Sequence, residues 1–293
     1  MSNGLVLARS AAGVPGTPGQ YFGRPTLRLE GAHCWIEVLA IGGPRIVGFG
    51  LAGGGNALGE TPQNSWDGPH GTYDLLGGHR LWFAPETPDC SVPDATGLTL
   101  APVPGAAGPA VRLMGAFEAP TGMRRTMEVR LDAAAAAVSV RHIVSNEGSG
   151  SRELSPWPIT QLPLGGVARV ELSEPPTEHR PNPNQLLVLW PYALWTDSRL
   201  AFGERSLTVT ATPGSPFKIG CASTLGEVSY LRAGLLFTKR FDPAVGARHP
   251  DLGSNIEIYC DDRTIELESL GPLVGLAPGE SVSHDERWEL HRV

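Results

Sequence analysis

The stretch SNIEIYCDDRTIELESLGPLVGLAPGESVSHDERWEL, residues 254–290, decides the fold of this chain. Apolar and polar side chains alternate over residues 256–260 and again over residues 264–269. Such alternation is typical of antiparallel strands with one buried face. The turn residues Cys260–Arg263 stand between the two runs, so we expect a β-hairpin here.

The same period of two recurs along the whole chain. Clear runs occupy residues 34–41, 126–131, 138–145 and 256–260, and each is bounded by Gly, Pro, Asn or Asp. No segment has a sustained apolar stripe of helical period. The alanine run 133–137 is expected to be a hairpin turn, although its composition also favours a helix start. The pattern therefore predicts an all-β, antiparallel sandwich of large size.

The length of 293 residues is compatible with one large β-sandwich domain. We expect residues 1–20, rich in Gly, Ala and Pro, to form a flexible segment. Residues 21–293 would then form the single domain. Residues 50–93 show little alternation and are expected to be a long loop, which in a compact domain usually has a function.

Composition excludes several classes of function. The net charge is −7, and only two lysines accompany 21 arginines without any basic run, so we expect no nucleic-acid partner. No stretch reaches the roughly 18 apolar residues of a membrane helix, and the N-terminus lacks the pattern of a secretory signal. The four cysteines have no metal or disulfide spacing and fit reduced core positions. These features favour a cytoplasmic protein without metal or cofactor.

The segment Gly77–Glu86 is the first candidate site. Arg80 offers a planar fork of donors for hydroxyls or carboxylates, and Trp82 offers a face for a sugar ring. His79 and Glu86 are further candidates in the same segment. The structural alternative is a turn and a strand in which Arg80 and Glu86 form an internal ion pair.

Two aromatic segments form the second group of candidates. The run Ser155–Gln161 places Trp157 between two prolines, which could present Trp157 and Gln161 to a cavity. The alternative is a tryptophan packed under a Pro-rich corner. The segment 189–197, with three large aromatic side chains, could line a groove or pack in the core.

The predicted hairpin supplies the third candidate site. Glu257 and Tyr259 share one face of its first strand, and Glu266 and Glu268 share one face of its second. Carboxylates gathered in this way can raise the pKa of one member, as acid–base catalysis requires. The alternative, a solvated acidic face, remains open. His142 lies on an apolar strand face and is expected to be a core residue.

The segments 77–86, 155–161 and 254–290 together resemble the galactose mutarotase-like superfamily, and most closely a bacterial branch grouped with the aldose 1-epimerases. The tail carries the resemblance best, because it looks like the closing hairpin of the family followed by its final L-x-PGES…W-x-L strand. The resemblance implies a β-supersandwich with a sugar in its concave groove. It also implies that Glu268, in Leu267-Glu268, is the catalytic base and that Arg80 binds the sugar.

One departure from the family pattern concerns the catalytic acid. Aldose 1-epimerases have a Thr-Asn-His segment whose histidine is the acid, whereas this chain has Ile159-Thr160-Gln161. A glutamine side chain cannot donate a proton as an acid at neutral pH. Either another group, such as His79, takes the role, or epimerase chemistry is absent.

The function predicted from the sequence is therefore a carbohydrate-active protein, with an epimerase on an unidentified sugar as the first hypothesis. Glu268 and His79 are its expected catalytic residues. The expected sugar-binding residues are Arg80, Trp82, Glu86, Trp157, Gln161, Glu257 and Tyr259. The second hypothesis is a non-catalytic carbohydrate-binding or sensor module. The expected partner is a small carbohydrate, and the pattern leaves the oligomeric state open.

Overall fold

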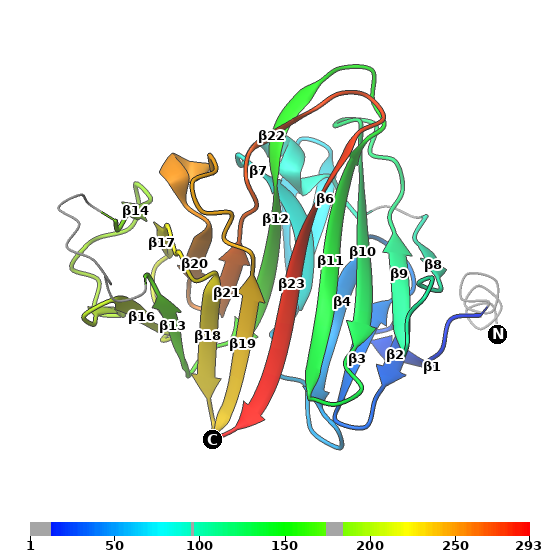
Figure 1. The fold of residues 1–293 in the computed structure, drawn as a ribbon, viewed down its shortest axis with the longest axis horizontal. Helices are drawn as coiled ribbons and strands as arrows, with labels where there is room; N and C mark the ends of the chain where they lie inside the picture. The colour runs from blue at the N-terminus through cyan, green and yellow to red at the C-terminus, as the bar shows by residue number, and fades with distance from the viewer. Residues whose placement is uncertain (1–12, 95–96, 174–183) are drawn as a thin grey trace.

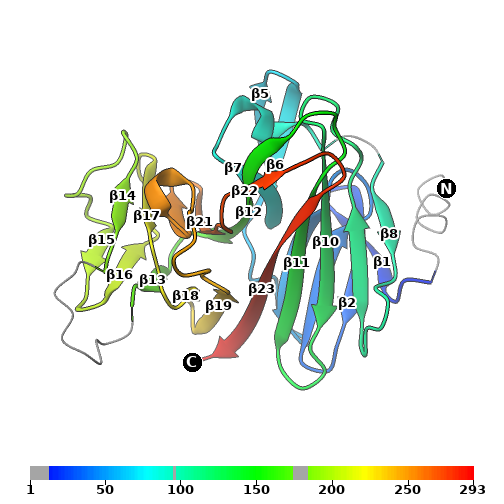
Figure 2. The same cartoon turned by 45° about the horizontal axis from the view of Figure 1, so that its top comes forward.

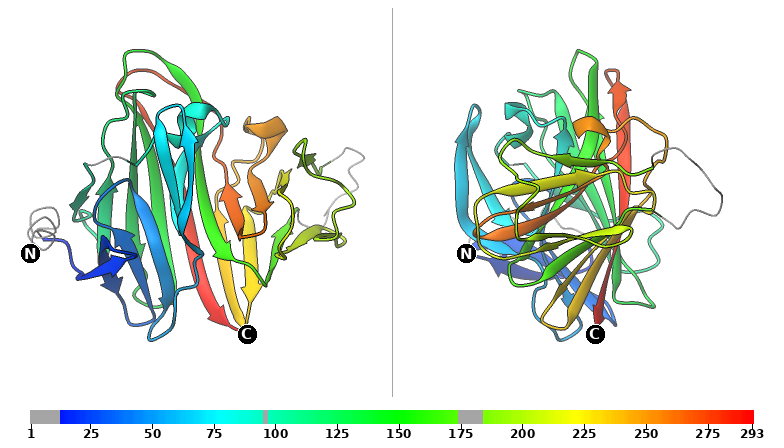
Figure 3. Two further views of the ribbon diagram at one scale, coloured as in Figure 1. Left: turned by 180° about the vertical axis from the view of Figure 1, so that it is seen from behind. Right: turned by 90° about the vertical axis from the view of Figure 1, so that its left-hand side faces the viewer.

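The computed structural model describes residues 13–94, 97–173 and 184–293 and consists of two large antiparallel sheets facing each other (Figure 1). The first sheet contains, from edge to edge, β1 (Thr17–Tyr21), β2 (Arg24–Glu30), β3 (Cys34–Leu39), β4 (Arg45–Leu51), β7 (His79–Ala84), β12 (Arg152–Pro163), β21 (Thr264–Ser269), β20 (Ile256–Cys260), β17 (Phe217–Cys221) and β14 (Leu187–Leu189), with β22 (Val274–Leu276) paired to β12. This sheet faces the viewer in the left panel of Figure 3.

The second sheet lies in front in Figure 1. It contains β15 (Leu200–Phe202), β16 (Ser206–Thr210), β13 (Val167–Glu171), β18 (Glu227–Arg232), β19 (Leu235–Phe241), β23 (Ser281–Arg292), β11 (Ala137–Asn146), β10 (Met123–Leu131), β9 (Ala110–Met114) and β8 (Thr99–Ala101). The described residues include two short 3₁₀ turns, η1 (Pro88–Ser91) and η2 (Asp251–Gly253), and no α-helix. No helix among these residues is long and apolar enough to cross a membrane.

The predicted all-β antiparallel sandwich is confirmed. The hairpin of residues 256–269 is β20 and β21, which turn at 261–263. The alanine run forms the bend between β10 and β11, as expected for a hairpin turn, and its last residue begins β11. The four cysteines are buried and unpaired.

The expected long loop at 50–93 is wrong, because most of these residues form strands. A two-stranded hairpin, β5 (Glu60–Gly68) and β6 (Gly71–Gly77), is followed by β7. It stands beside the main sheets and comes forward in Figure 2. The ring of Trp66 stacks on Tyr73 at 5.1 Å, and Tyr73 accepts a hydrogen bond of 3.0 Å from the Trp82 indole. These contacts order a sequence that lacks strand periodicity.

The expected flexible segment 1–20 is also corrected in part, since residues 17–20 belong to β1. Residues 1–12 of that segment lie outside the described residues.

The core between the two sheets combines apolar packing with a buried ion pair. Phe49 of β4 contacts Phe237 and Trp288 of the opposite sheet, with ring centroids 6.4 and 6.0 Å apart. Nearby, the Lys239 ammonium lies 3.0 Å from a carboxylate oxygen of Glu286, and both side chains are fully buried. Burial would raise the pKa of Glu286, but the Lys239 charge lowers it to about 2. Burial also lowers the pKa of Lys239, although the Glu286 charge opposes that shift.

We expect the substitution Lys239→Met to lower the free energy of unfolding by about 3–5 kcal/mol, because it leaves Glu286 as an unpaired buried charge. Urea unfolding at neutral pH measures this. The matched control is Arg240→Gln on the same strand, whose ion pairs with Glu227 and Glu289 lie at the surface. It should cost less than about 1 kcal/mol. Equal losses in the two variants would contradict the prediction.

Candidate functional site

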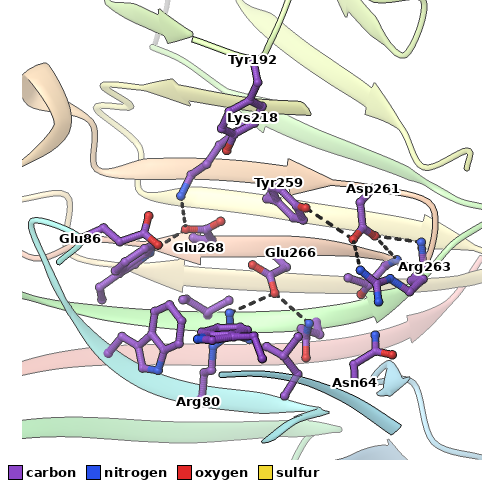
Figure 4. A pocket seen from close by; sticks show the side chains of 17 residues that line it. Asn64, Arg80, Glu86, Tyr192, Lys218, Tyr259, Asp261, Arg263, Glu266 and Glu268 are labelled. Atoms are coloured by element: carbon purple, nitrogen blue, oxygen red, sulfur yellow. Dashed lines mark hydrogen bonds and ion pairs between the residues drawn. The ribbon is translucent and has the colours of Figure 1, made fainter. Parts of the chain in front are cut away.

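A cavity of about 290 Å³ lies on the face of the first sheet that points away from the core. Strands β7, β12, β17, β20 and β21 form its floor, the hairpin β5–β6 borders one side, and Tyr192 reaches it from the segment after β14. Figure 4 shows the 17 side chains that line it. Most of the residues predicted to form a site meet in this cavity, namely Arg80, Trp82, Glu86, Trp157, Gln161, Tyr259 and Glu268.

Strand register explains why these side chains meet. On one row across the sheet, Arg80 of β7 pairs with Ile159 of β12, which pairs with Glu268 of β21, which pairs with Glu257 of β20. Directly paired residues on neighbouring strands point to the same face of a sheet. The row therefore carries all four side chains to the cavity side.

A second row lies two residues along the strands and points the same way. Gln161 of β12 pairs with Glu266 of β21, which pairs with Tyr259 of β20, which pairs with Lys218 of β17. The residues between the two rows, such as Leu267, point into the hydrophobic core. The sheet thus separates a polar face from an apolar face by strict alternation.

Glu268 is held in the site by two donors on one oxygen. Its Oε2 accepts a hydrogen bond of 2.6 Å from the Trp157 indole and one of 2.9 Å from the Lys218 ammonium. Both bonds stabilise the ionised carboxylate. Among the described residues, no group donates a hydrogen bond to Oε1 of Glu268. That oxygen is therefore available to take a proton from a bound molecule.

Lys218 is the cation in the part of the cavity that contains Glu268. Its ammonium also lies 2.7 Å from Oε2 of Glu257, and it sits 4.6 and 4.7 Å from the ring centroids of Trp157 and Trp190. Burial opposes its charge, but the Glu268 and Glu257 carboxylates raise the pKa of Lys218 above its ordinary value. Lys218 therefore remains an ammonium next to Glu268.

Glu257 lies behind Lys218 and is fully buried, so it does not line the cavity. Its burial raises the pKa of this carboxyl well above the ordinary range, and the nearby Lys218 only opposes the shift. The expectation that Glu257 contacts a sugar is therefore corrected. Its position fits a support for Lys218.

Glu266 occupies the other half of the cavity. Its Oε1 accepts hydrogen bonds from Arg80 at 3.1 Å and from the Gln161 amide at 2.8 Å. Arg80 thus pairs with Glu266 and not with Glu86, which was the structural alternative for this segment. Burial raises the pKa of Glu266 above its ordinary value, although the Arg80 guanidinium opposes the shift.

Arg80 and Gln161 retain unsatisfied polar atoms although both side chains are buried. Nε and Nη1 of Arg80 and Oε1 of Gln161 have no hydrogen-bond partner among the described residues. Buried polar groups in proteins are nearly always satisfied, by ordered water or ligand where protein atoms do not serve. These atoms belong to side chains that line the cavity, and they include both donors and an acceptor, the combination that a hydroxyl group can satisfy.

The two predicted tryptophans line the cavity, but their rings are packed against each other and are less exposed than aromatic rings that stack on a sugar. Trp82 and Trp157 meet edge to face at 5.5 Å, and each is less than 5% exposed. The Arg80 guanidinium lies 4.6 Å from the ring centroid of Trp82. Tyr192 is half exposed and is the more accessible aromatic ring of the site.

His79 is not in the cavity, so its expected role as a catalytic residue is wrong. It follows the alternation of β7 and points to the opposite face from Arg80. There its ring nitrogens lie 2.9 Å from the Thr160 hydroxyl and 2.7 Å from Nε2 of His142. Burial lowers the pKa of His79 well below its ordinary value, so the ring is neutral. His142 is a hydrogen-bonded core residue, as predicted.

His79, His142 and Glu286 are also a group whose ligand atoms lie within 4.8 Å of one another, the spacing of a metal site. However, Glu286 is already paired with the Lys239 ammonium, and it accepts a hydrogen bond from Ser269. The two imidazoles contact each other directly. The group therefore fits a hydrogen-bonded core better than an ion site.

Sequence reasoning missed Lys218 as a site residue and did not include Glu266 among the expected catalytic and sugar-binding residues. The available signal for Lys218 was a lone charge inside the apolar strand Phe217–Cys221. Its carboxylate partners come from other strands, and the register that joins them was not evident.

Comparison with solved structures identifies the fold. A TPR-domain containing protein from Parabacteroides distasonis superposes with a TM-score of 0.63 at 12% identity over 92% of this chain and 48% of that one. A galactose mutarotase-like protein from Lactobacillus casei gives a TM-score of 0.56 at 12% identity over 91% and 100% of the two chains. A candidate aldose 1-epimerase from Klebsiella pneumoniae gives 0.59 at 10% identity over 94% and 82%.

This chain therefore has the galactose mutarotase-like fold, as its resemblance implied. It spans about half the length of the Parabacteroides protein. No family model and no curated protein matches its sequence. At these identities the likeness concerns the fold, and the function has to be argued from the site.

The state of Glu257 can be tested through the pH dependence of stability. Its folded pKa is raised, so between pH 4.5 and that pKa the native state binds more protons than the unfolded state, and stability falls as pH rises. Glu257→Gln removes this loss. We expect its stability relative to the wild type to rise between pH 5 and pH 8, by an amount on the order of 1 kcal/mol, in urea unfolding.

Glu289→Gln is the control for this measurement. Partial burial opposes the effect of Arg287 and Arg240, but the two guanidiniums lower the pKa of Glu289, so its charge stabilises the fold above pH 4.5. This variant should therefore be less stable than the wild type by a nearly constant amount between pH 5 and pH 8, because the difference develops below pH 4.5. A pH-independent difference for Glu257→Gln would contradict the raised pKa.

Proposed function

We propose that the cavity binds an uncharged aldose and accelerates interconversion of its anomers, with Glu268 as the base. The observation that carries the proposal is the Glu268 carboxyl group, whose Oε2 accepts hydrogen bonds from Lys218 and Trp157 while Oε1 remains available. An ionised carboxylate at a cavity floor suits removal of the proton from an anomeric hydroxyl.

The polar lining supports a sugar as the ligand. The unsatisfied atoms of Arg80 and Gln161 offer donors and an acceptor to hydroxyl groups. Tyr192, the more accessible aromatic ring of the lining, adds apolar surface of the kind that carries the face of a sugar ring. The volume of about 290 Å³ accommodates a small ligand.

The charges of the lining support an uncharged sugar over a phosphorylated one. Its cationic residues are Arg80, Lys218 and Arg263. Lys218 lies 2.9 Å from the Glu268 carboxylate and Arg263 lies 3.6 Å from that of Asp261, while Arg80 donates a hydrogen bond to Oε1 of Glu266. A phosphate would have to displace one of these carboxylates, and it would be repelled by the remaining acidic groups. Hydroxyl groups face no such penalty.

We expect purified protein to accelerate anomeric exchange of at least one unphosphorylated aldose, measured by exchange NMR over a panel of sugars. Glu268→Gln should lower kcat by about 10²–10⁴-fold, because the amide cannot accept the proton. Glu227→Gln, which removes a surface carboxylate on β18, is the control and should keep full activity. Undiminished activity of Glu268→Gln would refute the assignment of the base.

A non-catalytic sugar-binding module is the second candidate, and the position of Gln161 favours it. In the aldose 1-epimerases that the chain resembles, a histidine acid is expected there. Titration calorimetry distinguishes the two functions, because a binding module would give saturable sugar binding without faster anomeric exchange. A cytoplasmic location belongs to the same proposal and rests on four cysteines that form no disulfide.

A further inference from the structure

The proposed reaction needs a second group, which protonates the ring oxygen while Glu268 takes the anomeric proton. Gln161 cannot supply that proton, and His79 points into the core. The titratable side chains that line the cavity, besides Glu268 and the arginines, are Glu86, Tyr192, Lys218, Tyr259, Asp261 and Glu266. The donor has to be found among them.

Glu266 is placed next to the base on the same strand. It precedes Glu268 by two residues, so both side chains point into the cavity with Cα atoms about 7 Å apart. Glu266 also pairs directly with Gln161 across the β12–β21 ladder. The residue that occupies the position of the expected acid therefore donates its hydrogen bond to Glu266.

The hydrogen bonds of Glu266 leave one of its oxygens for a proton. Arg80 and Gln161 both donate to Oε1, and Figure 4 shows the two dashed lines ending on the same oxygen. Among the described residues, no group donates to Oε2. A proton on Oε2 would therefore disturb neither contact, while Oε1 keeps the carboxyl group in a fixed orientation.

We propose that Glu266 is the proton donor to the ring oxygen, acting opposite Glu268 as the base. This inference rests on the proposed function of the cavity.

The environments of the other groups support this choice. Burial and the neighbouring Glu268 raise the pKa of Glu266 against the opposing Arg80, which favours a protonated carboxyl group. Burial raises the pKa of Tyr192 to about 12 and also raises that of Tyr259, and the acidic side chains beside Lys218 raise its pKa against its burial, so all three hold their protons tightly. Asp261 accepts two backbone hydrogen bonds on Oδ1 and pairs with Arg263 through Oδ2, so both of its oxygens are engaged. Glu86 is exposed and lies in the segment after β7, whereas Glu266 is buried on the same strand as Glu268.

The proton transfers balance within one catalytic cycle. Glu268 takes the proton of the anomeric hydroxyl, the C1–O1 double bond forms, the bond from C1 to the ring oxygen breaks, and that oxygen takes the proton from Oε2 of Glu266. Rotation about the C1–C2 bond exposes the other face of the carbonyl group. On closure the ring hydroxyl returns its proton to Glu266, and O1 takes one from Glu268. Neither residue is consumed.

The test is the pH dependence of kcat for the wild type, Glu266→Gln and Glu268→Gln on the sugar that exchanges fastest. The wild type should give a bell-shaped profile, because Glu268 has to be ionised and Glu266 protonated. Glu266→Gln should lower kcat by about 10²–10⁴-fold with little change in KM, and the decline at high pH should disappear. Its amide oxygen can still accept from Arg80 and Gln161, and circular dichroism confirms that the variant folds.

Infrared titration adds a measurement that does not depend on activity. The absorption of a protonated carboxyl group should be present at neutral pH in the wild type and in Glu268→Gln. It should be weaker by one group in Glu266→Gln. Since Glu257 is also expected to be protonated, the Glu257→Gln background isolates the signal of Glu266.

The outcomes separate this inference from the proposed function. If the wild type and Glu266→Gln are both active, or if the carboxyl signal is unchanged in that variant, the donor assignment is overturned. Glu268 would then remain the base. A wild type that accelerates exchange of no sugar in the panel would overturn the proposed catalysis and the donor role with it.

Discussion

The register of β12, β21 and β20 is the constraint on which the site depends. Glu266 and Glu268 face the cavity only because Leu267 between them faces the core. A slip of one residue would move both carboxylates into the apolar interior and Leu267 onto the polar face. The cost of burying unpaired carboxylates there fixes the register as firmly as the apolar contacts do.

Strand β21 lies between two buried ammonium groups, which are the only lysines of the chain. Lys218 pairs with Glu268 on the cavity side, and Lys239 donates a hydrogen bond of 3.0 Å to the carbonyl oxygen of Leu267 on the core side. Each ammonium is therefore satisfied by a carboxylate or a carbonyl group close to the proposed catalytic strand. A rigid strand suits a site whose two carboxyl groups have to remain in fixed positions.

The closing hairpin and its carboxylates could be predicted from the sequence, because alternation assigns each side chain to a face. The hairpin β5–β6 could not, since its strands contain Pro, Gly and Asn and are ordered by the contacts of Trp66, Tyr73 and Trp82. Local pattern carries no information about such contacts between distant residues. The wrong role for His79 has a different origin, because His79 and Arg80 are adjacent in β7 and alternation along the strand already places their side chains on opposite faces.

By itself the sequence determined the class of fold and the side chains that share each strand face, since both follow from a period of two. Only the tertiary structure decided which faces meet. It joined Gln161 to Glu266 and brought Lys218 to Glu257 and Glu268. It also decided which of these carboxyl groups have a raised pKa, because burial and the distance to a counter-charge depend on strands that are far apart in the chain.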